Sequence, residues 1–392
     1  MPPYLAGRKS EFADFFKLLQ QDVILDNMIL TGLRGVGKTV LLEAFKSIAI
    51  NNNWLWIGND LSEATSMSEE NIAIRLLTDL SVITSNIIIQ KKQLSKIGFI
   101  KEESHNDIFL NYDILRNIFS STPGLTSDKL KHTIHVVWES IKSLNKHGVV
   151  FAYDEAQNLS DKKEKEQYPL ALLLDVFQSI QRAGIPFLLI LTGLPTLAPK
   201  LVESRTFAER MFKVVFLDKL NADDSRDAII KPIQNDKCPI SLTEKSVNDI
   251  IEISKGYPYF IQFICRETYD SLLQNSNVQK SVPVKEILRK LDSDFFSGRW
   301  AKITDRQKEL LTIIAQLNNA SNEFTIQEIV DLSKKIAKKS FSNSHINQML
   351  ISLFNAGLIY KNRYSKYSFA VPLMNEFILR QIESLNTPPL LQ

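Results

Sequence analysis

The stretch GLRGVGKT at residues 32–39 decides the fold of this chain, because it fits the pattern GxxxxGK[ST]. A short apolar segment, residues 27–31, precedes it, and VLLEAFKSIAI follows from residue 40 with apolar side chains at helical spacing. A strand, a glycine-rich loop and a helix in this order are typical of a loop that holds phosphate groups with backbone N–H groups and the positive end of the helix dipole. The stretch therefore predicts a site for ATP or ADP with Mg²⁺.

Each position of this loop has an expected role. The glycines allow a tight turn of the backbone. Lys38 is expected to reach the β- and γ-phosphates, and Thr39 is expected to offer its hydroxyl to Mg²⁺. The alternative is a glycine turn that precedes a helix by chance. The residues expected to surround the nucleotide phosphates are Gly32, Leu33, Arg34, Gly35, Val36, Gly37, Lys38, Thr39 and Val40.

The acidic residues that such a loop needs stand in VVFAYDEAQNL, residues 149–159. Five mostly apolar residues predict a buried strand, and Asp154 and Glu155 follow at its carboxyl end, where ligands bind in parallel sheets. We expect Asp154 to hold Mg²⁺ through water, and Glu155 to orient and deprotonate the attacking water. The alternative is a pair of surface carboxylates at the end of a strand.

Two later segments supply further candidates. Thr192 ends an apolar strand in IPFLLILTGLPTL, where its hydroxyl is expected to bond the attacking water or the γ-phosphate; an ordinary strand-ending threonine is the alternative. SRTFAERMFKVVFL contains Arg205 and Arg210. An arginine just before an outer strand reaches the γ-phosphate of a neighbouring subunit, and we favour Arg210 for this role. The alternative is an exposed arginine on a helix. An arginine supplied in trans implies a homo-oligomer.

Composition narrows the class of protein. The chain has 392 residues, 44% of them hydrophobic, so we expect two or three domains with real cores. Its longest nearly unbroken apolar run, residues 185–194, has about half of the roughly 20 residues that a membrane-spanning helix needs. Two cysteines and five scattered histidines supply neither a disulfide framework nor a zinc site. We therefore expect a cytoplasmic protein with no membrane contact.

The order of the patterns predicts three domains. Alternating strands and helices over residues 1–217 indicate an α/β domain with the parallel sheet of a P-loop NTPase, which contains an insertion at about 61–130. Within the insertion, a helical pattern is followed by a polar, poorly periodic stretch, residues 101–128. Purely helical patterns over 218–298 indicate a helical lid, and residues 299–392 form the third domain.

The third domain has the pattern of a winged helix: three helices, two short strands joined by a basic turn, and a last helix. Its third helix carries short polar side chains that are suited to base edges, and the turn carries cations suited to phosphates. Winged helices also dock proteins, so the residues predict either duplex DNA or a protein partner. The residues expected to contact DNA are Asn343, His345, Asn347, Arg363 and Lys366.

Together these segments resemble a group of AAA+ ATPases that have a domain like that of the origin recognition complex and a C-terminal winged helix, and that lie close to the STAND signalling ATPases. The resemblance covers nearly the whole chain apart from the insertion. It is carried by LAGRKSEFADFFKLL at residues 5–19, GLRGVGKTVLL, VFAYDEAQNL, LTGLPTL, FAERMF, KGYPYFIQF and SFAVPLMNEF.

The resemblance implies that Gly7 and Arg8 lie near the adenine, and that Arg210 is the arginine supplied in trans. One departure stands out. Replication initiators of this type usually carry an arginine at the start of the third lid helix, whereas this chain has a turn with Gly256 and Pro258 there, as in STAND-like relatives. The turn is then expected to sense nucleotide through its backbone and through adenine packing, unless it is plain helix punctuation. Arg266 is a weaker substitute.

Two functions fit these features. The first is an ATPase, Mg²⁺-dependent and slow, whose nucleotide state controls a winged helix on DNA. The second is a STAND-like nucleotide-gated switch or scaffold that assembles with protein partners without DNA. DNA binding with a steep salt dependence distinguishes the first from the second.

Overall fold

The computed structural model describes residues 4–89, 108–234, 238–274, 281–337, 340–363 and 365–386. The chain divides into two compact units, each with its own hydrophobic core. Residues 90–107, which belong to the expected insertion, lie outside the described residues. The first unit comprises mainly Arg8–Thr31 and Lys38–Phe216, and the second comprises Pro2–Gly7, Gly32–Gly37 and Leu217–Gln392.

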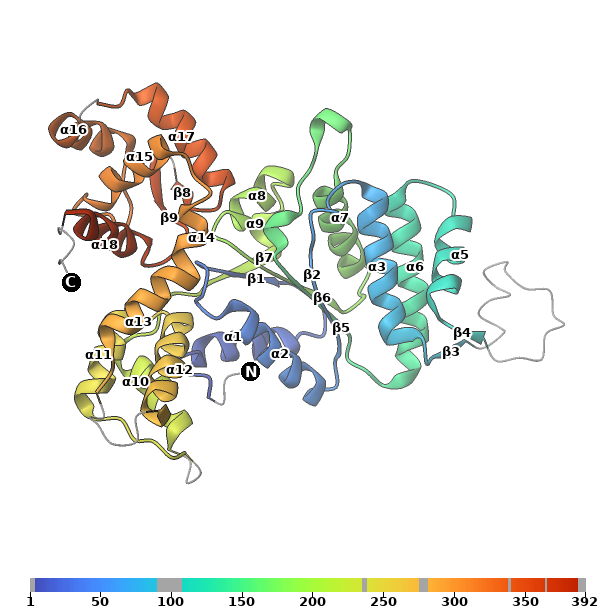
Figure 1. Cartoon of the computed structure of the whole chain (residues 1–392). Helices are drawn as coiled ribbons and strands as arrows, with labels where there is room; N and C mark the ends of the chain where they lie inside the picture. The colour runs from blue at the N-terminus through green and yellow to red at the C-terminus, as the bar shows by residue number, and fades with distance from the viewer. Residues whose placement is uncertain are drawn as a thin grey trace. The chain divides into compact units, whose positions relative to one another are not determined.

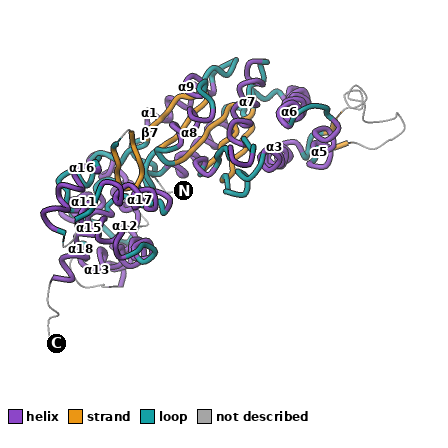
Figure 2. The backbone as a smooth tube through the Cα atoms, turned by 90° about the horizontal axis from the view of Figure 1, so that it is seen from above, coloured by secondary structure: helices purple, strands orange, loops and turns teal. Residues whose placement is uncertain are grey.

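A five-stranded parallel sheet forms the centre of the first unit (Figures 1 and 2). Every side chain of the three inner strands is buried, because helices cover both faces of such a sheet. The sequence predicts strands near residues 26–31, 54–58, 148–153, 186–191 and 212–217. The five strands occur within two residues of these bounds, which confirms the α/β fold class. In spatial order the strands are β2 (Leu55–Asp60), β5 (Val149–Asp154), β6 (Phe187–Gly193), β1 (Asn27–Thr31) and β7 (Phe212–Phe216).

The helices of the first unit alternate with these strands. Figure 1 shows α3, α6 and α5 side by side, and these helices contact one another. Short 3-10 turns occupy Lys142–Leu144, Ala156–Asn158 and Lys163–Lys165, and β3 (Ile88–Ile89) pairs with β4 (Ile108–Phe109). The helices are α1 (Lys9–Leu19), α2 (Lys38–Asn51), α3 (Glu69–Thr84), α5 (Tyr112–Ser121), α6 (Thr126–Ile141), α7 (Pro169–Arg182), α8 (Leu197–Ser204) and α9 (Ala208–Met211).

The polar stretch at residues 101–128 contains a helix, α5, where the sequence suggests no regular element. Its apolar side chains Leu115, Ile118 and Phe119 are buried on one face, and Asn111 accepts a hydrogen bond from the backbone N–H of Ile114 at its start. The helix is only about three turns long, and polar residues fill its outer face. Its amphipathic pattern is therefore too short to be evident within a polar segment.

A buried asparagine joins the inner strands of the sheet. Asn27 begins β1, and its side-chain oxygen accepts from the backbone N–H of Leu189 at 2.7 Å and from the amide of Gln181 at 2.8 Å. Its amide donates to the carbonyl of Met211 at 3.3 Å. The asparagine thus connects β1 with β6, α7 and the segment before β7, and all of its polar atoms are satisfied.

The second unit has a helical part and a winged helix. The winged helix has the predicted order, with three helices (α15 to α17), an antiparallel hairpin and a last helix. The elements are α10 (Ala222–Ile230), the turn Lys231–Ile233, α11 (Glu244–Ser254), α12 (Pro258–Gln274), α13 (Val284–Leu291), the π-helical turn Asp292–Ser297, α14 (Gly298–Trp300), α15 (Asp305–Ala315), α16 (Ile326–Ile336), α17 (Asn343–Asn355), β8 (Ile359–Arg363), β9 (Lys366–Phe369) and α18 (Met374–Asn386).

Helical turns run without a break from α13 through α14, across the boundary that the sequence places between residues 298 and 299. The rings of Phe296 and Phe377 stack there at 5.0 Å between centroids, and Trp300 meets Phe377 edge-on. The division of this unit into lid and winged helix stays a prediction. Among the described helices, none combines the length and the apolar composition that a membrane crossing requires.

Candidate active site

The loop at residues 32–37 connects the end of β1 to the start of α2. Gly35 and Gly37 have positive φ angles, +79° and +92°, which residues with a side chain rarely adopt. At Gly32 a Cβ atom would stand 2.3 Å from the carbonyl oxygen of Leu217, which no structure tolerates. These three positions therefore need glycine, and the resulting bend precedes the N-terminus of a helix, where anions bind.

The first unit brings Thr39 and Asp154 together across 115 positions of sequence. The Thr39 hydroxyl donates to Asp154 Oδ2 at 2.5 Å. Thr39 lies in the first turn of α2, and Asp154 is the last residue of β5, with only 6% of its surface exposed. The topology explains the meeting, because the carboxyl ends of β1 and β5 lie at the same edge of a parallel sheet.

These two oxygens suit the metal that the sequence implies. Mg²⁺ prefers oxygen ligands and usually binds one or two protein groups together with phosphates and water. A hydroxyl and a carboxylate already within hydrogen-bond distance match that donor set. Within the described ranges, no group of three or more His, Cys, Asp or Glu side chains could hold a metal by itself. The residues thus fit an ion whose remaining ligands come from a nucleotide and from water.

Glu155 stands beside this pair in an unusual backbone conformation. Its φ angle is +52°, in the left-handed region, and its backbone N–H donates to Asp154 Oδ1 at 2.8 Å. The Glu155 side chain is exposed, and one of its oxygens accepts a hydrogen bond from the amide of Gln157. Strained backbone of this kind collects at functional sites. With this backbone conformation, the side chain of Asp154 is buried and that of the next residue, Glu155, is exposed.

Gln157 is a contact residue that sequence reasoning missed. Its side-chain oxygen accepts from the backbone N–H of Leu194 at 3.1 Å, just after β6, and its carbonyl oxygen accepts from Lys200 of α8 at 2.6 Å. A Cβ at Gly193 would stand 2.5 Å from the Gln157 side-chain oxygen, so the amide packs closely against the end of the strand. The only sequence signal is an amide two positions after the acidic pair.

Thr192 lies in β6, in register with Leu30 of β1. Its hydroxyl is fully buried, and the structure gives it no hydrogen-bond partner among the described residues. The hydroxyl of Thr31, at the end of β1, is also buried without a hydrogen-bond partner among the described residues. A buried hydroxyl without a partner costs free energy, about 1–3 kcal/mol, so a polar group at this edge of the sheet would stabilise both.

The two candidate arginines differ in their contacts. Arg205 donates two hydrogen bonds to Asp175 of α7, at 2.9 and 2.7 Å. Its guanidinium is therefore paired within the first unit. The pairing raises the pKa of Arg205. Arg210 lies on α9 with an exposed side chain, and within the described chain it has no hydrogen bond or ion pair. The geometry leaves Arg210 available to another molecule.

The positions that the resemblance places near the adenine have local structural roles. Arg8 is buried and pairs with Glu11 at 3.3 Å. Gly7 has a φ of +63°, and a Cβ there would meet Asp224 at 2.6 Å. Gly256 has a φ of +80° and precedes Pro258, the first residue of α12.

Arg266, the weaker substitute for the lid arginine of replication initiators, pairs with the adjacent Glu267 at 3.2 Å. The nucleotide-binding roles of Gly7, Arg8, Gly256 and Pro258 stay predictions.

The winged helix presents a mixed surface. Asn343, His345 and Asn347 are exposed on α17, as expected of a helix that reads base edges, and Lys366 begins β9. The backbone of Arg363 ends β8, and its side chain lies outside the described part of the structure. The same helix also exposes two large apolar side chains that sequence reasoning did not single out, Ile351 and Phe354, with 64% and 44% of their surfaces accessible.

Comparisons with known proteins identify the fold. A family model described as a domain of unknown function (DUF8462) matches residues 293–378. No curated protein matches the chain. The ADP form of the ORC2 protein of Aeropyrum pernix is similar at a TM-score of 0.53, with 14% identity over 98% of this chain and 96% of that one.

The same ORC2 protein in ADPNP–ADP complexes gives a TM-score of 0.51, with 13% identity and the same coverage. A structure of the Aeropyrum pernix Orc1 protein in complex with DNA gives 0.47, with 15% identity over 98% and 95% of the two chains. At these identities the likeness to the two ORC2 structures shows the fold alone: an α/β unit with a parallel sheet, followed by a helical part and a C-terminal winged helix.

Proposed function

We propose that this chain binds and hydrolyses ATP with Mg²⁺, and that its nucleotide state controls a winged helix that binds duplex DNA. The observation that carries the proposal is the Thr39–Asp154 hydrogen bond, which joins the phosphate loop to the acidic strand end. The ADP and ADPNP–ADP forms in the names of the ORC2 structures support nucleotide binding on this fold.

Catalysis on this arrangement is positioning together with charge neutralisation. Mg²⁺, when bound by Thr39 and Asp154, neutralises charge on the phosphate oxygens. Lys38 adds a positive charge at the β- and γ-phosphates, and the carboxylate of Glu155 orients the attacking water and accepts its proton. The hydroxyl of Thr192, buried without a partner in the described residues, supplies a hydrogen bond at the same edge of the sheet. Arg210 acts on the site of a neighbouring copy.

Two substitutions test the nucleotide site. Lys38→Ala should weaken ATP binding at least 100-fold, because it removes the charge that faces two phosphates. Glu155→Gln should keep ATP affinity within a factor of three and reduce hydrolysis about 100-fold or more, because a general base contributes roughly 10²–10⁴-fold. Titration with a fluorescent ATP analogue and phosphate release measure the two quantities. Equal ATP affinity in the wild type and in Lys38→Ala would contradict the proposal.

A second candidate function is a nucleotide-gated scaffold whose winged helix docks a protein. The exposed Ile351 and Phe354 on α17 favour it, because large apolar side chains grouped on one helix are typical of protein contacts. Binding of a duplex DNA should show a steep loss of affinity with salt if the first function holds, and Asn347→Ala should then weaken it. ATP-dependent assembly without any DNA binding would favour the scaffold.

A further inference from the structure

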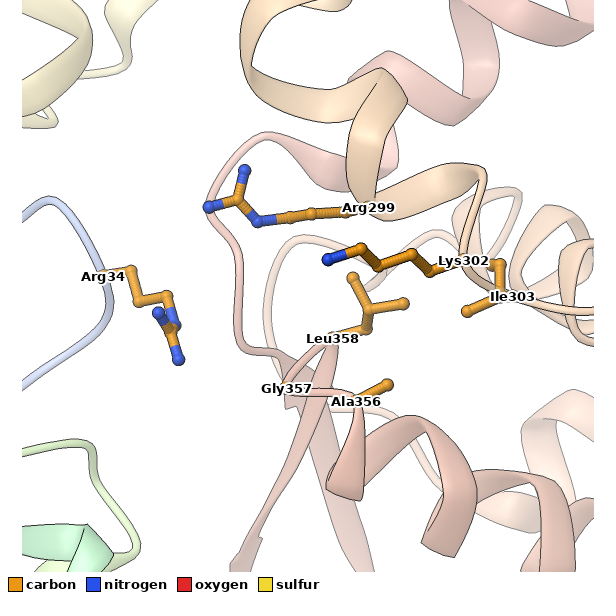
Figure 3. A pocket seen from close by; sticks show the side chains of 7 residues that line it. All are labelled: Arg34, Arg299, Lys302, Ile303, Ala356, Gly357 and Leu358. Atoms are coloured by element: carbon orange, nitrogen blue, oxygen red, sulfur yellow. The ribbon is translucent and has the colours of Figure 1, made fainter. Parts of the chain in front are cut away.

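The second unit contains a small basic pocket outside the metal-binding pair (Figure 3). Its volume is about 240 Å³, which is below the roughly 300–1,000 Å³ of pockets that hold drug-sized ligands. The pocket therefore suits one small group rather than a whole nucleotide. The residues that line it are Arg34, Arg299, Lys302, Ile303, Ala356, Gly357 and Leu358.

Three cations reach this pocket from separate segments. Arg34 belongs to the loop at residues 32–37, whereas Arg299 lies in α14 and Lys302 follows that helix. Figure 3 shows the side chains of Arg299 and Lys302 extending toward the side on which Arg34 lies, whereas the guanidinium of Arg34 is turned downward. Convergence from segments far apart in the sequence is a property of the folded unit, since no local run of basic residues produces it.

The orientation of Arg299 is fixed by its own helix. Its guanidinium lies 4.3 Å from the centroid of the Phe295 ring and donates to the carbonyl oxygen of Phe295. A guanidinium has five N–H donors, so one backbone contact leaves most of them for a ligand. The planar contact with the ring also reduces the conformational freedom that a ligand would have to restrict.

The charge of this cluster is not balanced within the described residues. No carboxylate there forms an ion pair with Arg34, Arg299 or Lys302, although neighbouring cations such as Lys308 have such partners. Burial is the main cause that lowers the pKa of Arg299, and the nearby positive charge of Arg34 lowers it further. An anion placed among them would relieve this repulsion.

The turn at residues 356–358 forms another wall of the pocket. Gly357 adopts a φ of +68°, and a Cβ built there would lie 3.7 Å from a terminal nitrogen of Arg34. Ala356 and Leu358 complete this wall with small or apolar atoms. The wall contributes no carboxylate that would compete for the cations.

We infer that this pocket binds a phosphate group, held by Arg34, Arg299 and Lys302. Two guanidinium groups and an ammonium suit a compact multivalent oxyanion, and the volume excludes a larger ligand. The group has two chemical sources, a free phosphate or a phosphate of a nucleic-acid backbone. The inference goes beyond the proposed function and does not depend on nucleotide hydrolysis.

Calorimetric titration with inorganic pyrophosphate tests the site. The titration uses the Lys38→Ala background, because pyrophosphate is also a ligand of the phosphate-binding loop. Arg34 belongs to that loop, so the pocket is identified through Arg299 and Lys302, which lie outside it. We expect Lys38→Ala to retain one pyrophosphate site. Adding Lys302→Gln, an exposed position, should weaken this site about tenfold, and adding Arg299→Gln as well should abolish it. Circular dichroism checks that each variant is folded.

Lys285→Gln is the matched control, because Lys285 is an exposed lysine of the same unit that lies outside the pocket. It should leave pyrophosphate binding unchanged. The inference is overturned if Lys38→Ala shows no pyrophosphate site, or if the Lys302 and Lys285 variants bind alike. Neither result would decide ATP binding, which is measured separately with an intact Lys38.

Measurements of duplex DNA binding distinguish the two sources of the phosphate. If the pocket holds a backbone phosphate, Lys302→Gln should reduce the slope of log K against log salt concentration by about 1 relative to Lys285→Gln. An unchanged slope together with lost pyrophosphate binding supports a free phosphate as the ligand.

Discussion

At the scale of single residues, the candidate site depends on contacts that join distant positions. The sequence alone predicts that Thr39 and Asp154 work together, because their motifs imply it, and the structure brings their oxygens to 2.5 Å. The contacts of Gln157 were not predictable, because an amide has no spacing rule that marks it. Its two side-chain bonds connect Glu155 to the end of β6.

Gln157 is therefore expected to position Glu155 for its proposed work on water. Replacing it with leucine keeps the volume and removes both side-chain bonds. We expect Gln157→Leu to reduce kcat for ATP hydrolysis about tenfold with ATP affinity unchanged, since a base loses efficiency when it is free to rotate. Steady-state phosphate release and nucleotide titration measure these quantities.

Gln274→Leu serves as control, because Gln274 is exposed at the end of α12, away from these contacts. An unchanged kcat in Gln157→Leu would show that Glu155 needs no support from this amide.

At the scale of elements, the sheet was largely predictable. Apolar runs of strand length between helical patterns gave all five strands, because buried parallel strands are apolar throughout. The buried Asn27 shows where such reasoning stops. The sequence places Asn27 in the first strand, but it does not show that four hydrogen bonds satisfy the side chain inside the sheet.

Asn27→Leu should destabilise the first unit by about 2–4 kcal/mol, because the side-chain oxygen of Gln181 and the backbone N–H of Leu189 would lose their partners inside the core. Urea unfolding followed by tryptophan fluorescence measures this, since Trp54, Trp56 and Trp138 all belong to the first unit.

The matched control for this variant is Asn117→Leu, because Asn117 is exposed on α5 of the same unit. It should change stability by less than about 0.5 kcal/mol. Equal stability of the Asn27 and Asn117 variants would show that the buried network contributes nothing.

The start of α16 gives a pH dependence. The side chain of Glu328 accepts from the backbone N–H of Thr325 at 2.6 Å and from its hydroxyl at 2.8 Å. Burial alone would raise the pKa of Glu328, but these bonds and the amide of Asn319 lower it overall. The ionised carboxylate thus stabilises the fold above the ordinary pKa of a glutamate, and this contribution disappears as the pH falls through the lowered value.

Glu328→Gln should therefore be less stable than the wild type at pH 7, by about 1 kcal/mol, and this difference should shrink as the pH falls below the ordinary pKa of a glutamate. Thermal unfolding by circular dichroism between pH 7 and pH 3 measures it. Glu286→Gln, at an exposed position of α13, should show no such trend. A difference that grows toward low pH would reverse the sign argued here.

At the scale of the whole molecule, the order of the parts was predictable from the sequence, whereas two local features were not. The P-loop sheet and the winged helix follow from periodicity and spacing. The helix α5 and the continuous helical path across residues 298 and 299 were not predictable. A short amphipathic helix and a helical connection without a break do not change the local composition. The role proposed for Arg210 involves a second copy of the chain, so the structure of one chain does not test it.

Mixing two inactive variants tests whether Arg210 acts in trans. Lys38→Ala lacks ATP binding but supplies the arginine, and Arg210→Ala binds ATP but lacks it. Each should hydrolyse ATP at least tenfold more slowly than the wild type, and an equimolar mixture should regain part of the activity. Phosphate release measures this, and Arg182→Ala controls for the loss of an exposed arginine. A mixture as inactive as its components would rule out the role in trans.

At position 155 the left-handed backbone favours one type of residue and the proposed chemistry needs another. A positive φ there is most easily met by glycine or asparagine, and any longer residue costs roughly 1–2 kcal/mol of strain. If variants of this position were chosen for thermal tolerance alone, the acidic residue would be displaced. Glu155 thus lowers the stability of the fold. Its carboxylate therefore serves a purpose other than folding.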